Sequence, residues 1–158
     1  MTIGYIKGDL FAADSEYCLA HCISADLALG AGIAKQFTAR LDMKNRLKTE
    51  YGDISTGDRG GRVFTVDRVF NLVTKSRYFH KPTYETLKMC LEEMRDIMEQ
   101  QDIKRLAMPK IGCGLDRLEW GRVESIIGEV FGGLMWKLRF TPLTDRGYET
   151  ALFRGFYR

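Results

Sequence analysis

The sequence lacks the features that would place it in a membrane or in an oxidising compartment. No apolar run approaches the ~18 residues of a membrane span, and the opening residues MTIGYIKGDL contain no apolar core of a signal peptide. The four cysteines form no C-x-x-C pair and no spacing typical of a small secreted disulfide scaffold. We therefore expect free thiols and a cytoplasmic protein.

A large excess of charge of one sign is also absent. The chain has 24 Lys and Arg against 21 Asp and Glu, and this net charge of +3 is too small to indicate nucleic-acid binding by electrostatics alone. An anionic small ligand is compatible with it. Repeats, low-complexity segments and linkers are missing too, so the 158 residues, 45% of them hydrophobic, predict one domain with a core of its own.

Apolar periodicity predicts an α/β protein. Short apolar and aromatic runs indicate strands at 3–7, 17–23, 103–108 and 135–140, and the alternation on either side of Asp67 and Arg68 indicates a hairpin over 62–75. Helical spacing predicts helices over 30–41, from Pro82 and Thr83 to 101, and over 120–131. Strands that alternate with helices form a layered α/β structure, and the hairpin makes its sheet mixed.

Two glycine-rich turns lie between a predicted strand and a predicted helix. They are Gly30-Ala31-Gly32 and Gly112-Cys113-Gly114. Ligands of α/β sheets bind beyond the carboxyl ends of strands, where bare backbone N–H groups can hold oxyanions and glycine allows close approach. Two such loops together favour a clamp for a diphosphate, although tight turns or helix packing are alternatives. The chain has no G-x-x-x-x-G-K-[ST], and GAGIAKQF lacks the third glycine of the dinucleotide fingerprint, so a different dinucleotide-like ligand is required.

Five segments together resemble a known family. KGDLF (7–11), AHCIS (20–24), GAGIA (30–34), TK with HKPTY (74–84) and MPKIGCGLDRLEW (108–120) are similar to the motifs of macrodomains, in the same order and over roughly residues 3–141. More narrowly, they resemble the lysine- and aspartate-dependent branch typified by the terminal ADP-ribose protein glycohydrolase. The resemblance implies a three-layer α/β/α macrodomain over 1–143, with a mixed, mostly parallel central sheet and a crevice for ADP-ribose. The tail 144–158 departs from the family, and we expect an arm packed on the domain or on a neighbour.

The resemblance also implies the ligand contacts. Asp9 would accept the adenine amino group, with Leu10 beside it. The distal ribose and the diphosphate would be enclosed by the two glycine loops and the residues next to them, with Cys113 contributing mainly its N–H. The ligand-binding residues expected in this way are Asp9, Leu10, His21, Ser24, Gly30, Ala31, Gly32, Ile33, Ala34, Thr74, Pro109, Ile111, Gly112, Cys113, Gly114 and Leu115. No cofactor and no metal are expected, because Cys18, His21 and Cys22 lie on one short strand without a second ligand pair.

Catalysis is assigned by the same resemblance. Macrodomains that hydrolyse through asparagine would have Asn after the second strand, where this chain has His21, Ser24 and Asp26. The lysine-dependent branch implies that Lys75 attacks the anomeric carbon of the distal ribose and that Asp116 is the acid/base. A basic run after Lys75, with Arg77, His80 and Lys81, would favour the neutral amine by like-charge repulsion. By pattern alone, a lysine at a strand end is more often solvated and an aspartate before a helix more often an N-cap.

The function expected is removal of ADP-ribose from acidic side chains, together with deacylation of O-acyl-ADP-ribose. The partners would then be ADP-ribose and an ADP-ribosylated substrate, with no membrane, and the chain would be a monomer. Two alternatives stay open. One is a DNA ADP-ribosyl glycohydrolase antitoxin of the same branch, and the other is a reader that binds ADP-ribose without turnover. Phe140 or the tail could cover the adenine.

Overall fold

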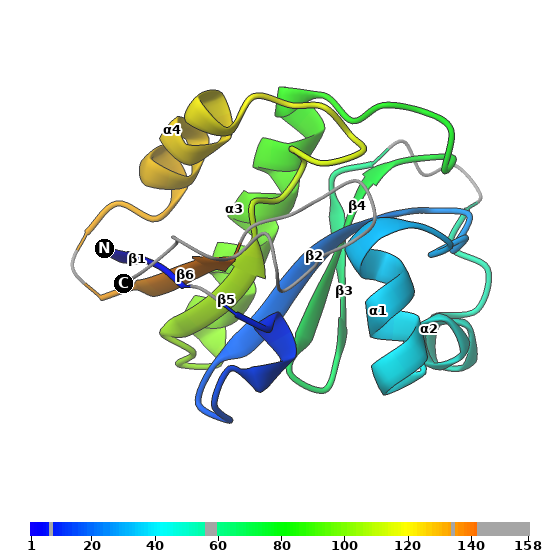
Figure 1. Cartoon of the computed structure of the whole chain (residues 1–158), viewed down its shortest axis with the longest axis horizontal. Helices are drawn as coiled ribbons and strands as arrows, with labels where there is room; N and C mark the ends of the chain where they lie inside the picture. The colour runs from blue at the N-terminus through cyan, green and yellow to red at the C-terminus, as the bar shows by residue number, and fades with distance from the viewer. Residues whose placement is uncertain (7, 56–59, 134, 142–158) are drawn as a thin grey trace.

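The computed structural model describes residues 1–6, 8–55, 60–133 and 135–141 as an alternation of strands and helices (Figure 1). The strands are β1 (Thr2–Tyr5), β2 (Cys18–Ser24), β3 (Arg62–Val66), β4 (Val69–Lys75), β5 (Arg105–Pro109) and β6 (Lys137–Thr141). The helices are the 3-10 turn η1 (Leu10–Ala12), α1 (Gly32–Leu41), α2 (Met43–Tyr51), α3 (Tyr84–Gln100) and α4 (Trp120–Val130). None of the described helices is long and apolar enough to cross a membrane.

The strands form one mixed sheet in the order β1-β6-β5-β2-β4-β3. All neighbours are parallel except β3 and β4, which form the antiparallel hairpin predicted around Asp67. Asp67 has a φ of 51°, in the left-handed region that tight turns require and that aspartate tolerates. The mixed, mostly parallel sheet predicted from the sequence is therefore confirmed.

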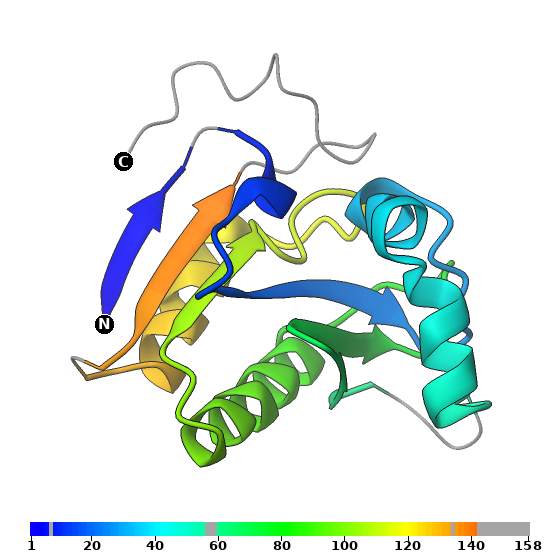
Figure 2. The same cartoon turned by 90° about the horizontal axis from the view of Figure 1, so that it is seen from below.

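Helices cover both faces of this sheet and give three layers (Figure 2). One core packs α1 and α2 against the sheet through Phe37, Met43 and Leu47. The other core packs α3 and α4 through side chains that include Leu91 and Ile127. Because successive residues of a strand point to opposite faces, Ile23 of β2 joins the first core and Cys22 lies against the second.

The helix α2 is an element that the periodicity does not predict. Met43 and Leu47 are its buried residues, and one apolar pair at i and i+4 is too little to form a recognisable stripe. The helix α3, in contrast, begins where its sequence signals place it. Thr83 is its N-cap, with the Thr83 side chain accepting from the N–H of Thr86 over 3.0 Å.

The sheet opens between β2 and β5, and this opening positions the site. The two strands pair only at Cys18 with Leu106 and at Leu19 with Ala107, whereas β2 stays paired with β4 as far as Ser24. Their carboxyl ends therefore diverge. A crevice at the carboxyl ends of parallel strands is where α/β sheets bind ligands.

Candidate active site

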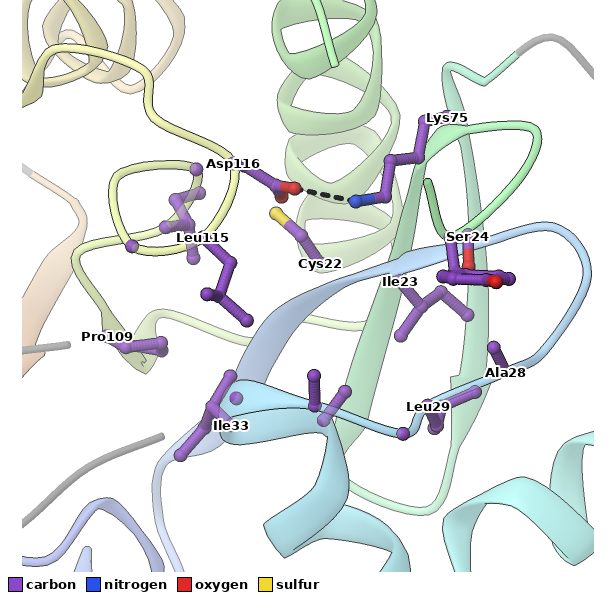
Figure 3. A pocket seen from close by; sticks show the side chains of 18 of the residues that line it. Cys22, Ile23, Ser24, Ala28, Leu29, Ile33, Lys75, Pro109, Leu115 and Asp116 are labelled. Carbon is purple, nitrogen blue, oxygen red and sulfur yellow. Dashed lines mark hydrogen bonds and ion pairs between the residues drawn. The ribbon is translucent and has the colours of Figure 1, made fainter. Parts of the chain in front are cut away.

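A cavity of about 420 Å³ occupies the opening between β2 and β5 (Figure 3). Its wall comes from the end of β2, the turn before α1, the end of β4 and the loop after β5. Most of the residues expected to bind the ligand line it. They are Ser24, Gly30, Ala31, Gly32, Ile33, Ala34, Pro109, Ile111, Gly112, Gly114 and Leu115, and they are joined by Lys75 and Asp116.

Lys75 and Asp116 meet inside this cavity. Lys75 ends β4, Asp116 lies 41 residues later in the loop after β5, and the Lys75 Nζ and Asp116 Oδ1 atoms are 2.6 Å apart. Their side chains are 14% and 16% exposed, so this ion pair is largely withdrawn from water. Figure 3 shows the two side chains pointing toward each other from opposite walls.

The basic run after β4 does not surround Lys75 in the way expected. Arg77 and His80 are exposed, and Lys81 Nζ donates to the carbonyl oxygen of Leu115 over 2.8 Å. Arg77 instead lies close enough to Asp26 to help lower the pKa of that carboxyl. The ionic partner of Lys75 is thus a carboxylate, which can take the proton that the lysine must lose before it attacks.

The loop after β5 lines the cavity with residues whose backbone N–H groups are not used within the described fold. Gly112 has a φ of 75°, and the loop closes through a hydrogen bond from the N–H of Leu118 to the carbonyl of Gly112 over 2.7 Å. The amides of Gly114, Leu115 and Asp116 donate to no acceptor in the described part of the chain. Consecutive open amides of this kind form an anion-binding nest.

A second set of open amides faces this loop from α1. Gly32 begins the helix with a φ of 60°, and Ala31 caps it without a side-chain hydrogen bond. The first N–H groups of a helix have no intrahelical partner and carry its positive dipole. The two glycine loops therefore bring N–H groups to one cavity, as a diphosphate clamp requires.

Five of the residues expected at the ligand lie outside the lining of the cavity. Cys113 donates its N–H to Lys110 O over 3.3 Å and its thiol to Ile111 O, so it has no free N–H to offer and the open amides belong to its neighbours. Thr74 is 1% exposed, and its carbonyl accepts from Thr86. The remaining residues are Asp9, Leu10 and His21.

Asp9 is the N-cap of the turn η1, and Leu10 is its first residue. Asp9 Oδ1 accepts the N–H of Phe11 over 2.9 Å, and Asp9 Oδ2 pairs with Arg40 Nη1 over 2.8 Å. Leu10 is 1% exposed and packs in the core. The contact of Asp9 with adenine thus stays a prediction, and Leu10 contributes packing.

His21 points into the core, away from the cavity. It stacks on Phe37 with ring centroids 3.8 Å apart, and its Nε2 lies 2.6 Å from Asn71 Oδ1. Burial lowers the pKa of His21 to about 4, although the hydrogen bond with Asn71 acts to raise it. His21 is absent from the described lining of the cavity, although Ile23 on the same face of β2 lines it, so a contact of His21 with the ligand stays a prediction.

Several lining residues were not expected from the sequence: Cys22, Ile23, Ala28, Leu29, Tyr78 and Lys81. The alternation along β2 would have placed Cys22 beside Ser24. Burial, followed by the nearby Asp116 carboxylate, raises the pKa of the Cys22 thiol well above its ordinary value, so it stays neutral. Tyr78 had no local signal, because only the hydrogen bond of its N–H to Asp26 holds it at the rim, whereas Lys81 belongs to the basic run expected near Lys75. Within the described residues, no three metal-ligating side chains come together.

The family model described as "Macro domain" matches residues 20–127, more than half of the sequence, and the chain belongs to the macrodomain family. It is 44% identical over 133 residues to the "ADP-ribose glycohydrolase OARD1" of Homo sapiens, covering 82% of this chain and 84% of that protein. It is 25% identical over 143 residues to the "DNA ADP-ribosyl glycohydrolase" of Thermus aquaticus, covering 82% of this chain and 38% of that protein.

Solved structures show the same fold. The macrodomain of Mycobacterium tuberculosis DarG superposes with a TM-score of 0.76 at 25% identity, over 89% of this chain and 97% of that one. Thermosipho africanus DarTG, determined in complex with ADP-ribose, superposes with a TM-score of 0.73 at 17% identity, over 90% of this chain and 42% of that one. At 17% identity the second likeness concerns the fold alone.

Proposed function

We propose that this chain is an ADP-ribose glycohydrolase that releases ADP-ribose from acidic side chains, with Lys75 as the nucleophile and Asp116 as the acid/base. The observation that carries the proposal is the Lys75–Asp116 ion pair, buried in a cavity whose other wall presents open amides. The name and the 44% identity of the human relative support the reaction class.

The geometry suggests how the two side chains divide the work. The ammonium of Lys75 gives a proton to Asp116 Oδ1, 2.6 Å away, and the neutral amine bonds to the anomeric carbon of the distal ribose. The bond from that carbon to the carboxyl oxygen of the substrate breaks, and the carboxylate leaves with the bonding electrons. The departing carboxylate takes the proton from Asp116, which becomes a carboxylate again. Water then loses a proton to Asp116 and adds to the same carbon as the carbon–nitrogen bond breaks. The neutral lysine amine that leaves takes this proton from Asp116, which restores the ion pair.

The same arrangement extends to O-acyl-ADP-ribose. An acyl ester on the anomeric oxygen of the distal ribose presents a carboxylate leaving group at the same carbon, and we include its deacylation in the proposal. The open amides at 114–116 would hold the diphosphate in both reactions.

Substitution of Lys75 tests this mechanism. Lys75→Ala should abolish release of ADP-ribose from a glutamate-ADP-ribosylated protein while leaving ADP-ribose affinity nearly unchanged, because the amides that hold the diphosphate remain. Lys75→Arg should not restore turnover, since arginine stays protonated. Lys88→Ala is the matched control and should keep wild-type turnover, because Lys88 also pairs with a carboxylate, Glu129 Oε2 over 3.2 Å, but lies outside the described lining of the cavity. Wild-type turnover by Lys75→Ala would overturn the mechanism.

Asp116→Ala should also stop turnover, by a different route. If Lys75 of this variant still attacks the anomeric carbon but water does not hydrolyse the resulting covalent intermediate, mass spectrometry will detect protein linked to ADP-ribose at Lys75. A wild-type protein that binds ADP-ribose tightly but releases none from any conjugate would establish the reader function instead.

A second substrate is favoured by the rim of the cavity. Tyr78 and Phe79 are 65% and 66% exposed, and their rings stack edge to face with centroids 5.3 Å apart. Exposed Arg77 and Lys81 flank them. Exposed aromatic rings among cations are typical of surfaces that stack the bases of single-stranded nucleic acid. We include ADP-ribosylated DNA as the second candidate substrate, in keeping with the name of the Thermus aquaticus relative.

Removal of the two rings distinguishes the candidates. Tyr78→Ala with Phe79→Ala should weaken turnover of ADP-ribosylated single-stranded DNA by about tenfold or more, the scale of one base stack, beyond any loss with an ADP-ribosylated peptide, because Tyr78 also lines the cavity. Met135→Ala removes another exposed apolar side chain, 51% exposed, and serves as the control. Equal effects on both substrates would argue against the DNA candidate.

A further inference from the structure

Ser24 and Asp26 form a hydrogen-bonded pair in the wall of the cavity. Ser24 ends β2, is 5% exposed and lines the cavity next to Lys75, its register partner on β4 (Figure 3). Its Oγ lies 2.6 Å from Asp26 Oδ1. This is a short, charge-assisted hydrogen bond at the place where the distal ribose would bind.

The hydrogen bond with Asp26 makes the Ser24 hydroxyl an acceptor toward any ligand in the cavity. Partial burial acts to raise the pKa of Asp26, but hydrogen bonds from Ser24 and from the N–H groups of Tyr78 and Ala28 outweigh it and lower the pKa. Asp26 is therefore a carboxylate, which can only accept hydrogen bonds. Ser24 must be the donor, so its single proton is engaged and its oxygen offers lone pairs alone to the cavity.

An oxygen that only accepts selects its partner. Phosphate oxygens have no proton to give it, whereas a sugar hydroxyl does. We propose that Ser24 Oγ accepts a hydrogen bond from the 2-hydroxyl of the distal ribose, and that Asp26 is the positioning residue that holds Ser24 in this role. The inference rests on the proposed function, because the 2-hydroxyl is the one next to the carbon that Lys75 attacks. Hydrogen bonds to this hydroxyl strengthen in the transition state of glycoside cleavage.

Asp26 also ties Ser24 to the strand that carries Lys75. Asp26 Oδ2 accepts the N–H of Tyr78 over 2.9 Å, and the N–H of Asp26 donates to Ser76 O over 3.2 Å. The neighbouring N–H of Ala25 donates to Lys75 O over 3.0 Å. The acceptor and the nucleophile are thus held in one rigid unit.

Paired ligands test the proposal without any need for turnover. Calorimetry should show that the wild-type protein binds ADP-ribose about tenfold more tightly than the analogue without the 2-hydroxyl of the distal ribose, the value of one hydrogen bond. Ser24→Ala should bind both ligands equally, and Ser24→Thr, which keeps the hydroxyl, should retain the preference. Asp26→Asn should reduce it, because a neutral amide that can donate or accept no longer fixes the direction of the Ser24 proton.

Asp53 supplies the matched control. Its Oδ1 accepts from Ser55 Oγ over 2.6 Å, the same pair of groups, but neither residue lines the cavity. Asp53→Asn should keep the preference for ADP-ribose. Turnover of an ADP-ribosylated peptide gives a second measurement. Ser24→Ala and Asp26→Asn should each lower kcat by a larger factor than they raise KM. Thermal unfolding checks that each variant is folded.

The outcomes separate this inference from the proposed function. Equal binding of both ligands by the wild-type protein, or an unchanged preference in Ser24→Ala, would overturn the role of Ser24. An equal loss in Asp53→Asn would overturn the role of Asp26. A wild-type protein that prefers ADP-ribose over the analogue but hydrolyses no conjugate would refute the glycohydrolase function and would still support the contact between Ser24 and the 2-hydroxyl.

Discussion

The imidazole of His21 is fully buried, and this has a measurable consequence for stability. Burial lowers the pKa of His21 from its ordinary 6.5 to about 4 in the folded protein. The unfolded chain thus takes up a proton near pH 6.5, while the folded protein does so only near pH 4. The contribution of this group to stability is therefore complete above the unfolded pKa and is lost as the pH falls toward the folded pKa.

We expect the free energy of unfolding to fall by up to about 3 kcal/mol through His21 as the solution is acidified across this window. Urea denaturation at a series of pH values measures it. His21→Phe should remove this part of the pH dependence, whatever its absolute stability. His80→Gln, at an exposed position, is the control and should retain it, because His21 is still present. An unchanged pH dependence in His21→Phe would refute the assignment.

At the scale of one element, the loop after β5 depends on Gly112. A Cβ built there would lie 2.9 Å from Leu118 Cδ1, and the φ of 75° is one that L side chains rarely adopt. Gly30, in the other glycine loop, has no positive φ, and its added Cβ would meet only Ala28 O at 3.8 Å. Two glycines that look alike in the sequence thus differ in how strictly glycine is required.

Gly112→Ala should lower the free energy of unfolding by about 1–3 kcal/mol and weaken ADP-ribose binding, because the open amides that follow would move. Gly30→Ala should be tolerated. Calorimetry with ADP-ribose, together with urea denaturation, measures both effects. If the two alanine variants behaved alike, the loop geometry would not be what holds the diphosphate.

At the same scale, the sequence predicted the elements with strong local signals. The hairpin follows from alternation around Asp67, and α3 begins at the Pro82-Thr83 signal. The helix α2 lacked such a signal because its stability comes from packing Met43 and Leu47 under the sheet. The observed ends of the strands differ from the predicted ends by a few residues. Hydrogen bonding to neighbouring strands decides where a strand stops, and the local sequence does not show it.

At the scale of the whole molecule, the described lining of the cavity comes from residues that precede the last described strand. The lining runs from residue 22 to residue 116, and the last strand ends at Thr141. The tail 144–158, expected to be a packed arm, lies outside the described residues. We expect its deletion to leave hydrolysis of an ADP-ribosylated protein largely intact.

A longer deletion is the control for this experiment. Removal of 137–158 takes away β6, which pairs with both β1 and β5, so that protein should not fold. Circular dichroism and an activity assay on both deletions measure the difference. Loss of activity from the shorter deletion, with the fold preserved, would show that the tail belongs to the pocket.

The sequence by itself determined the local features of this protein and the candidates for its chemistry. Glycines that permit left-handed turns, apolar spacing that selects strand or helix, and a family motif around Lys75 and Asp116 are all properties of short segments. They were enough to predict the α/β layers, the two glycine loops at the cavity and the two side chains to which we assign the proposed chemistry.

Only the tertiary structure decided which of these residues meet. The distance between Lys75 and Asp116, 41 positions apart, depends on the order of strands in the sheet and on the divergence of β2 from β5. The burial of His21 and the engagement of the Ser24 proton by Asp26 depend on which face of β2 meets which loop. Hydrogen bonds and ion pairs act over a few ångströms, so residues far apart in the chain acquire a shared chemistry only when the fold closes that distance.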